Sequence, residues 1–160
     1  MNEENQTPRG SPGRPRLRRG WLLLVAVAAL AYWTSLPDES AGGDWPTGFR
    51  QALEAARSAR RPLLVEFSAP NCPHCVRMKR EVLGRRTVAE ALDSFELVRV
   101  NPWEQDDLAT RYRVLGVPVY AVLDPEGRLV ARLEGYVPVS EFVSFLRRTA
   151  AAAGAPPAAS

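Results

Sequence analysis

Apolar residues between positions 47 and 67 follow first a helical and then a strand-like spacing. From Phe49 to Ala56 they recur every three or four residues, which predicts a helix over about residues 47–60 that Pro62 ends. The next run, Leu63-Leu-Val-Glu-Phe67, is short and apolar apart from one glutamate. Such a run is typical of a strand buried on both faces, where a lone carboxylate needs a partner or a function.

Similar patterns continue to residue 151 and predict a mixed sheet. After the first strand we expect a helix from Cys72 to about Leu83 that Gly84 ends, followed by a short helix capped by Thr87 and running to Leu92. A strand at 95–100 and a short helix at about 104–112 come next. Strands at 119–123 and 128–133, joined by the turn Asp124-Pro-Glu-Gly127, precede a last helix at about 139–151. Strands joined by helices and followed by a hairpin form a sheet with helices on both faces. The predicted fold class is therefore α/β, in one domain spanning residues 47–150.

An uncharged apolar run precedes this domain. Trp21 to Leu36 contains 16 residues without a charge, a little short of the roughly 20 that span a bilayer untilted. Five arginines lie before the run, which favours a cytoplasmic N-terminus and an exported domain. We expect a single-pass anchor at residues 21–36 in a bacterial inner membrane, with a basic cytoplasmic segment at 1–20, a linker at 37–46 and the domain facing the periplasm. The alternative is a signal peptide cleaved near Ala29-Leu30-Ala31, which would release a soluble secreted protein.

Charge adds little to the picture of the domain. The chain carries a formal net charge of +3, but the five arginines and two glutamates of residues 1–20 account for all of it, because the remaining 16 basic and 16 acidic residues cancel. The sequence shows no basic stripe and no nucleic-acid motif, which argues against nucleic-acid binding. Residues 151–160 are rich in alanine and proline, which predicts a disordered tail.

Cys72-Pro73-His74-Cys75 contains both cysteines and the single histidine of the chain. A disulfide across so small a loop would constrain the unfolded chain little, so a structural crosslink explains the pair poorly. Reversible redox chemistry fits the spacing better. Half of a zinc site is the alternative, but carboxylates would have to complete it because His74 is the only histidine. We expect no metal.

The position of the two cysteines on a predicted helix indicates their roles. Cys72 falls at the helix start, where unsatisfied N–H groups and the helix dipole stabilise a thiolate. It is therefore the candidate nucleophile, and Cys75, one turn further and more buried, is the candidate resolving cysteine of a mixed-disulfide exchange. His74, near the Cys72 sulfur, would favour the thiolate by hydrogen bonding or by charge. A solvated histidine without influence is the alternative.

These features together resemble the thioredoxin fold over about residues 47–150. The matching segments are Leu63 to Cys75, similar to the family's first strand and active-site loop, Gly116-Val-Pro-Val119, similar to its cis-proline loop, Asp124 to Arg128, similar to its hairpin, and Gly135-Tyr136 with the helix that follows. The pattern is similar to exported or membrane-tethered thioredoxin-like domains, including the C-terminal domain of DsbD proteins, whereas the Pro-His dipeptide is typical of DsbA oxidases. Asn71 stands where thioredoxins usually carry a tryptophan, which leaves partner recognition open, and the chain lacks the helical insertion of DsbA proteins.

The resemblance implies roles for further residues. Glu66 lies six residues before the first cysteine, the spacing of a buried acid that relays a proton to or from the resolving cysteine, and burial should raise its pKa. Arg99 would pair with it from the second strand; an exposed glutamate is the alternative. A cis Val117–Pro118 bond would pack against the disulfide, with an ordinary trans bond as the alternative. Pro73, Val117 and Pro118 would contact the substrate.

We therefore expect an exported thiol-disulfide oxidoreductase whose redox group is the Cys72–Cys75 disulfide, with no bound cofactor. Its partners would be exported protein thiols and disulfides, together with a membrane electron donor or acceptor, and the protein itself would be a monomer. A reductase dedicated to cytochrome c maturation is one alternative. A non-catalytic binding or chaperone module that keeps the fold is the other.

Overall fold

Residues 25–29 and 45–153 are described by the computed structural model, and they fall in two compact units. Residues 25–29 form a short helix. Among these two described ranges no helix is long and apolar enough to cross a membrane. The predicted segment at 1–20, most of the anchor at 21–36, most of the linker at 37–46 and the end of the tail lie outside the described residues, so their boundaries stay predictions.

A four-stranded sheet in the order β2-β1-β3-β4 forms the centre of residues 45–153. β1 (Leu63–Phe67) lies parallel to β2 (Glu96–Val100) and antiparallel to β3 (Val119–Leu123), which forms a hairpin with β4 (Leu129–Glu134). Gly127 closes the hairpin with a φ of +82°, a conformation that glycine adopts without a Cβ penalty. Each predicted strand is confirmed to within one residue at either end.

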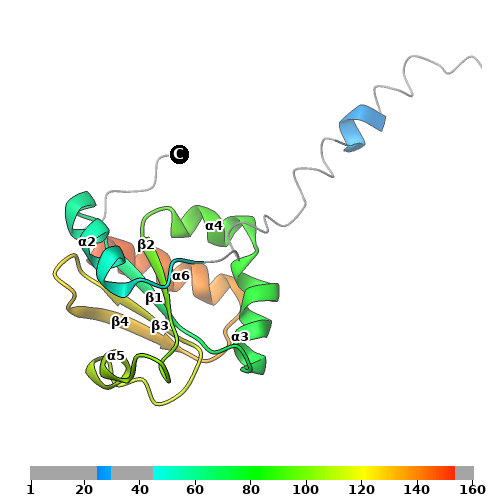
Figure 1. The fold of residues 1–160 in the computed structure, drawn as a ribbon. Coiled ribbons are helices and arrows are strands. Elements are labelled where there is room, and N and C mark those ends of the chain that lie inside the picture. Colours follow the sequence, from blue (N-terminus) through cyan, green and yellow to red (C-terminus); the bar gives the residue numbers. More distant parts are fainter. Residues whose placement is uncertain (1–24, 30–44, 154–160) are drawn as a thin grey trace, which may run out of the picture. The chain divides into compact units, whose positions relative to one another are not determined.

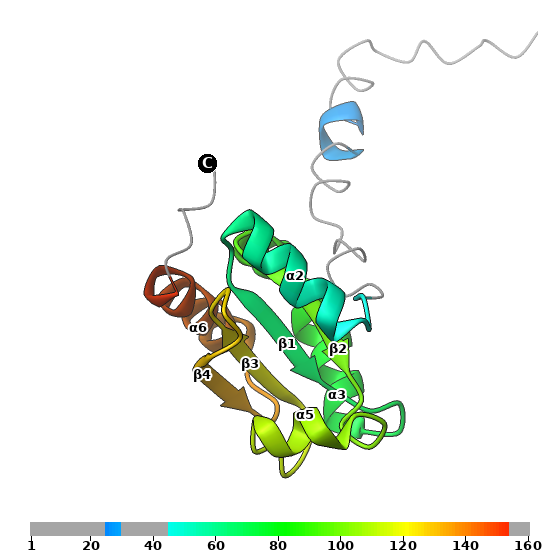
Figure 2. The same ribbon diagram turned by 60° about the vertical axis from the view of Figure 1, so that its left-hand side comes forward.

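Helices cover both faces of the sheet, as Figure 1 and, after a rotation, Figure 2 show. One face packs against α2 (Phe49–Ala59) and α5 (Asp106–Arg111), and the other against α3 (Pro73–Met78), α4 (Arg86–Leu92) and α6 (Val139–Ala152). Helix α2 ends where predicted: Arg60 takes a left-handed conformation and Pro62 follows it into β1. The mixed α/β architecture expected from the sequence is confirmed.

The active-site helix and the helix after it differ in detail from the expectation. The helix that begins after Cys72 does run to Leu83, but its second half, η1 (Lys79–Leu83), is a π-helix, which brings both Val82 and Leu83 fully into the core. The prediction that Thr87 caps the next helix is wrong. That helix begins at Arg86 with Arg85 as its N-cap, because the chain turns back into a helix directly after Gly84, so Thr87 already lies in its first turn.

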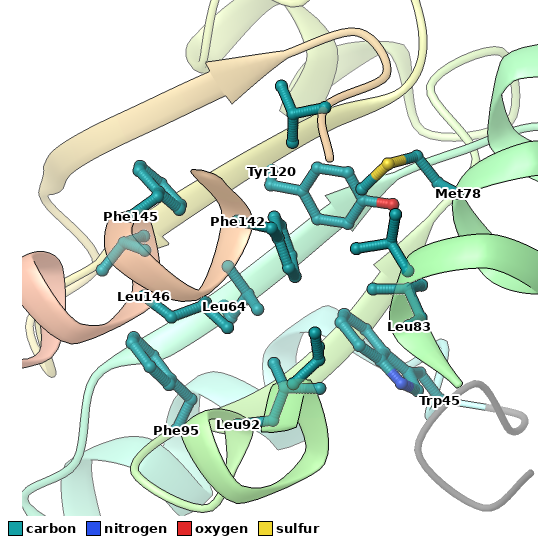
Figure 3. Packing of buried hydrophobic residues seen from close by; sticks show 14 residues of the cluster. Trp45, Leu64, Met78, Leu83, Leu92, Phe95, Tyr120, Phe142, Phe145 and Leu146 are labelled. Carbon is teal, nitrogen blue, oxygen red and sulfur yellow. The ribbon is translucent and has the colours of Figure 1, made fainter. Parts of the chain in front are cut away.

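The hydrophobic core consists of two layers separated by the sheet. Successive residues of β1 point to opposite faces, so Leu63 and Val65 join the layer under α2 and α5, whereas Leu64 joins the layer under α3, α4 and α6. In the second layer the rings of Tyr120 and Phe142 meet edge to face with their centroids 4.8 Å apart (Figure 3). All five residues of β1 are buried, which confirms a strand covered on both faces and leaves its glutamate in the interior.

Candidate active site

The two cysteines form a disulfide at the start of α3. Cys72 is the N-cap residue of this helix and is half-buried, whereas Cys75 in the first turn is only 4% exposed. The Cys75 backbone N–H donates a hydrogen bond to Cys72 Sγ at 3.1 Å. The helix start therefore directs an N–H group at the more accessible sulfur, an arrangement that stabilises a thiolate there once the disulfide is reduced.

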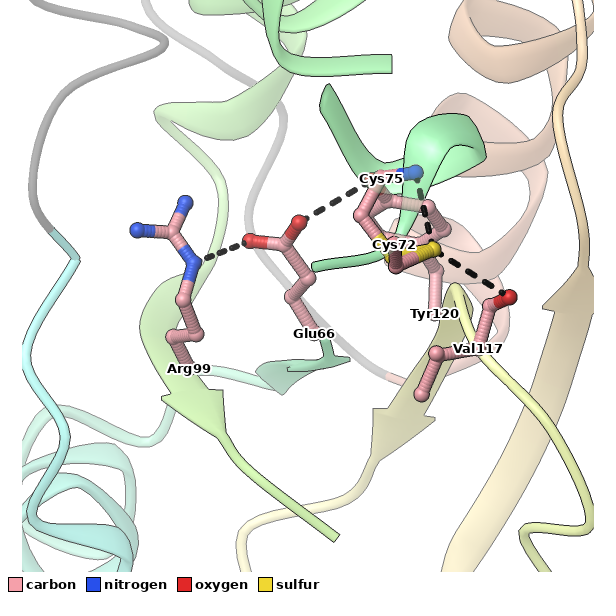
Figure 4. The surroundings of a disulfide bond; sticks show 6 residues. All are labelled: Glu66, Cys72, Cys75, Arg99, Val117 and Tyr120. Carbon is pink, nitrogen blue, oxygen red and sulfur yellow. Dashed lines mark hydrogen bonds and ion pairs between the residues drawn. A yellow bond between two sulfur atoms is a disulfide. The ribbon is translucent and has the colours of Figure 1, made fainter. Parts of the chain in front are cut away.

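A second loop brings backbone up to the accessible sulfur. The Val117–Pro118 peptide bond is cis, as the resemblance implies, and the Val117 carbonyl oxygen lies 3.6 Å from Cys72 Sγ (Figure 4). The Gly135 N–H donates to the Pro118 carbonyl at 2.8 Å, which ties this loop to the segment after β4. Val117 is half-buried and Pro118 is buried, while Pro73 is exposed in the first turn of α3.

Glu66 is buried on the face of the sheet that carries α3, with 1% of its surface exposed. The strand register places it directly opposite Arg99 on β2 and Tyr120 on β3. Arg99 Nε donates to one carboxylate oxygen at 2.8 Å, and the Tyr120 hydroxyl donates to the other at 3.2 Å (Figure 4). The predicted Glu66–Arg99 pair is confirmed, and the alternative of an exposed strand glutamate is excluded.

Burial dominates the electrostatics of this carboxylate. Desolvation raises the pKa of Glu66 above its ordinary value of 4.5, although the Arg99 charge and the hydrogen bonds from Arg99 and Tyr120 oppose the shift. Burial, followed by the Glu66 charge, likewise raises the pKa of Tyr120, so this phenol stays protonated and remains a donor. The raised pKa brings the carboxyl group closer to the range in which it can exchange a proton near neutral pH.

Glu66 and Cys75 line the same cavity. Its volume is about 430 Å³, and Lys79, Arg99 and Glu104 also line it. Cys75 and the buried Glu66 carboxyl group therefore share one cavity, although they come from different elements. Within residues 25–29 and 45–153, no group of three or more histidine, cysteine, aspartate or glutamate side chains is placed to hold a metal ion.

His74 lies between the cysteines in sequence but points outward. It is exposed, and it makes no hydrogen bond or ion pair with any other residue of the described ranges. The structure therefore does not bring the imidazole into contact with Cys72, and an influence on the thiolate stays a prediction. Two residues near the site were not anticipated from the sequence: Tyr120, which binds Glu66, and Trp103, which lies across a cavity from Cys72.

Comparisons with known proteins agree with this geometry. A family model described as a thioredoxin-like domain matches residues 49–150. The thiol:disulfide interchange protein DsbD of Pseudomonas fluorescens is 30% identical over 104 residues, which cover 61% of this chain and 18% of that protein. The chain thus spans about a fifth of the length of the DsbD relatives that it matches.

Solved structures show the same fold. A thioredoxin from Thermus thermophilus aligns with a TM-score of 0.63 and 33% identity, over 69% of this chain and 88% of that one. The oxidised C-terminal domain of DsbD from Neisseria meningitidis aligns with a TM-score of 0.56 and 20% identity, over 66% of this chain and 98% of that domain. This chain belongs to the thioredoxin-like family and is related to DsbD proteins and thioredoxins.

Proposed function

We propose that this protein is an exported protein-disulfide oxidoreductase that exchanges dithiols and disulfides with extracytoplasmic protein partners. One observation carries the proposal: a half-buried Cys72 with an N–H donor on its sulfur is joined to a buried Cys75 that shares a cavity with Glu66. Reversible exchange needs an accessible nucleophile, a shielded resolving thiol and a nearby acid. A disulfide that served stability alone would need neither an accessible sulfur with an N–H donor nor a buried acid beside the second cysteine.

The first step joins the protein to its partner. The Cys72 thiolate, stabilised by the Cys75 N–H, attacks one sulfur of the partner disulfide. The partner S–S bond breaks as the new bond to Cys72 forms, and the second partner sulfur leaves as a thiolate that takes a proton from water. The cis-proline loop supports this step, because the Val117 backbone lies beside Cys72 Sγ, where an extended partner segment can pair with it.

The second step releases the partner. The Cys75 thiol gives its proton to the Glu66 carboxylate through the cavity they share, and its sulfur attacks Cys72 Sγ. The bond between Cys72 and the partner breaks, and the remaining partner thiolate is protonated. Two electrons have then passed from the cysteine pair to the partner disulfide. The same steps in reverse oxidise a partner dithiol, with Glu66 returning the proton to Cys75.

The proposal includes a location and a source of electrons. Residues 21–36 would anchor the chain in a bacterial inner membrane with residues 47–150 in the periplasm, because an uncharged apolar run follows five arginines. A membrane electron donor or acceptor would recycle the cysteine pair. Fractionation of cells that make the full chain tests the anchor: the protein should stay with the membranes in high salt. Recovery of a soluble form beginning near Tyr32 would show instead that the segment is cleaved.

The reduction potential of the Cys72–Cys75 couple decides the direction. The full chain in detergent is equilibrated with glutathione buffers, and the oxidised fraction is measured by thiol alkylation. A potential near about −120 mV would make the protein a donor of disulfides, whereas a value near about −270 mV would make it a reductase of the kind that cytochrome c maturation requires.

Variants of the two cysteines test the chemistry itself. Cys72→Ser should abolish exchange, whereas Cys75→Ser should retain the first step and accumulate a mixed disulfide with the partner. Full activity in cells for the Cys72→Ser variant would contradict the proposal and favour a binding or chaperone module.

A further inference from the structure

Trp103 presents a large apolar surface next to the active-site cysteine. Its side chain is 67% exposed, and a cavity of about 320 Å³ separates it from the loop that leads into α3. The cavity is lined by Ala69, Pro70, Asn71, Cys72, Asn101 and Trp103. Cys72 and Trp103 therefore line the same depression, although they lie about 30 positions apart in the chain.

A tight turn after β2 holds Trp103 in this position. The Trp103 backbone N–H donates to the Asn101 side-chain oxygen at 3.2 Å, and the Asn101 amide donates to Glu104 at 2.7 Å. The backbone N–H groups of Glu104 and Gln105 both donate to the Asn101 carbonyl at 3.1 Å. Because the turn is already ordered, a ligand that packs on the indole need not order the backbone first.

The chemistry of the depression favours an apolar ligand. None of its six lining side chains is charged, whereas the cavity on the Cys75 side is lined by Glu66, Lys79, Arg99 and Glu104. The residue before the nucleophile, Asn71, is short and polar, so this position offers no aromatic ring to a partner. The large aromatic side chain among the residues that line this depression is that of Trp103.

We propose that Trp103 determines substrate preference by binding the side chain next to the reactive cysteine of the partner. During exchange that cysteine is bonded to Cys72, so its neighbour in the partner must lie within reach of the adjoining depression. An aromatic or large aliphatic residue fits the uncharged lining and packs on the indole. This assignment rests on the exchange chemistry proposed above.

Peptides with one cysteine, blocked as a mixed disulfide with thionitrobenzoate, test the assignment. The reduced full chain attacks the peptide sulfur and releases coloured thionitrobenzoate; Cys75 then displaces the peptide as a thiol, and the Cys72–Cys75 disulfide forms. Two peptides are compared, one with phenylalanine on both sides of the cysteine and one with glycine. The wild type should react about tenfold faster with the phenylalanine peptide, equivalent to about 1.4 kcal/mol.

Variants at Trp103 separate preference from general activity. Trp103→Ala should react with both peptides at the rate of the wild type with the glycine peptide, and Trp103→Phe should keep most of the preference. Leu129→Ala, which truncates another exposed apolar side chain on β4, is the matched control and should behave as the wild type. A preference that survives Trp103→Ala, or an equal loss of rate with both peptides, would overturn the assignment of Trp103 but would leave the exchange function standing. If neither peptide releases thionitrobenzoate in a manner that depends on Cys72, the exchange function fails as well.

Discussion

Replacing Arg99 by methionine removes the cation that faces Glu66 and keeps most of the apolar stem. In the wild type Arg99 Nε lies 2.8 Å from the carboxylate, and the guanidinium carbon lies 5.7 Å from the ring centre of Trp45. Methionine can still pack toward Trp45, so the main loss is electrostatic. The variant leaves a carboxyl group that is 1% exposed with the Tyr120 hydroxyl as its remaining hydrogen-bond donor among the described residues.

The size of the effect follows from the proton that Glu66 can take up. The folded state raises the pKa of Glu66, so it holds this proton more tightly than the unfolded chain does. The resulting stability is fully present below the ordinary pKa of 4.5 and is lost as the pH rises through the folded-state pKa. If the carboxyl of the variant stays protonated throughout, each pH unit above 4.5 costs about 1.4 kcal/mol of stability. This sets a ceiling of about 3 kcal/mol on the extra loss at pH 7.

The pKa of Glu66 is already raised in the wild type, so the wild type also loses some stability between pH 4.5 and pH 7. The difference between variant and wild type is therefore smaller than the ceiling. We therefore expect Arg99→Met to lower the free energy of unfolding more at pH 7 than at pH 4.5, by an amount that stays below the ceiling of about 3 kcal/mol. The measurement is urea unfolding of the oxidised protein at both pH values, since oxidised cysteines do not titrate.

A matched control distinguishes the buried pair from a surface one. Arg86→Met breaks the ion pair with Glu90, which is 3.0 Å long and lies on the exposed face of α4. That variant should change stability little and should show no such dependence on pH. If Arg99→Met costs the same at pH 4.5 and pH 7, the loss comes from packing, and the inference that Glu66 is a buried charge held by Arg99 is wrong.

Three other variants test a contact in the core, the turn between β3 and β4, and a hydrogen bond to Glu66. Phe142→Ala removes a fully buried ring from its edge-to-face contact with Tyr120 and should lower the free energy of unfolding by about 3–5 kcal/mol in urea. Gly127→Ala introduces a Cβ at a φ of +82° and 3.3 Å from Leu53 Cδ2, so it should cost about 1–2 kcal/mol and lower the midpoint of thermal unfolding. Tyr120→Phe removes a donor to the Glu66 carboxylate, so its cost should be larger at pH 8 than at pH 4.5; equal costs would contradict this.

Local signals were sufficient for most of the fold. The apolar runs of β1 and β3 are each preceded by a proline, Pro62 or Pro118, so the sequence marks where both strands begin. The glutamate within β1 stood out because a carboxylate is costly among buried apolar residues. Its pairing with Arg99 depended on the resemblance, since a single sequence does not show which residues of two parallel strands lie opposite each other.

Features that depend on tertiary position could not be read in this way. Thr87 has the chemistry of a cap, but the end of the preceding π-helix decides where the next helix starts. Tyr120 reads as an ordinary strand residue until the β1–β3 register places it opposite Glu66. Trp103 lies in a turn without periodicity, so only the folded chain shows that it faces Cys72. His74 shows the opposite case: its neighbours in sequence are the cysteines, yet its side chain points to solvent.

The row of polar side chains across three strands also has a consequence for how the sheet assembles. Arg99, Glu66 and Tyr120 occupy the same level on β2, β1 and β3. If β2 or β3 slipped by one residue against β1, its polar side chain would turn to the other face of the sheet and leave the buried Glu66 carboxylate without that partner. Misaligned sheets built from these valine- and leucine-rich strands are therefore penalised, and apolar packing alone would distinguish them less sharply. The buried polar contacts between the three strands therefore favour a single strand register.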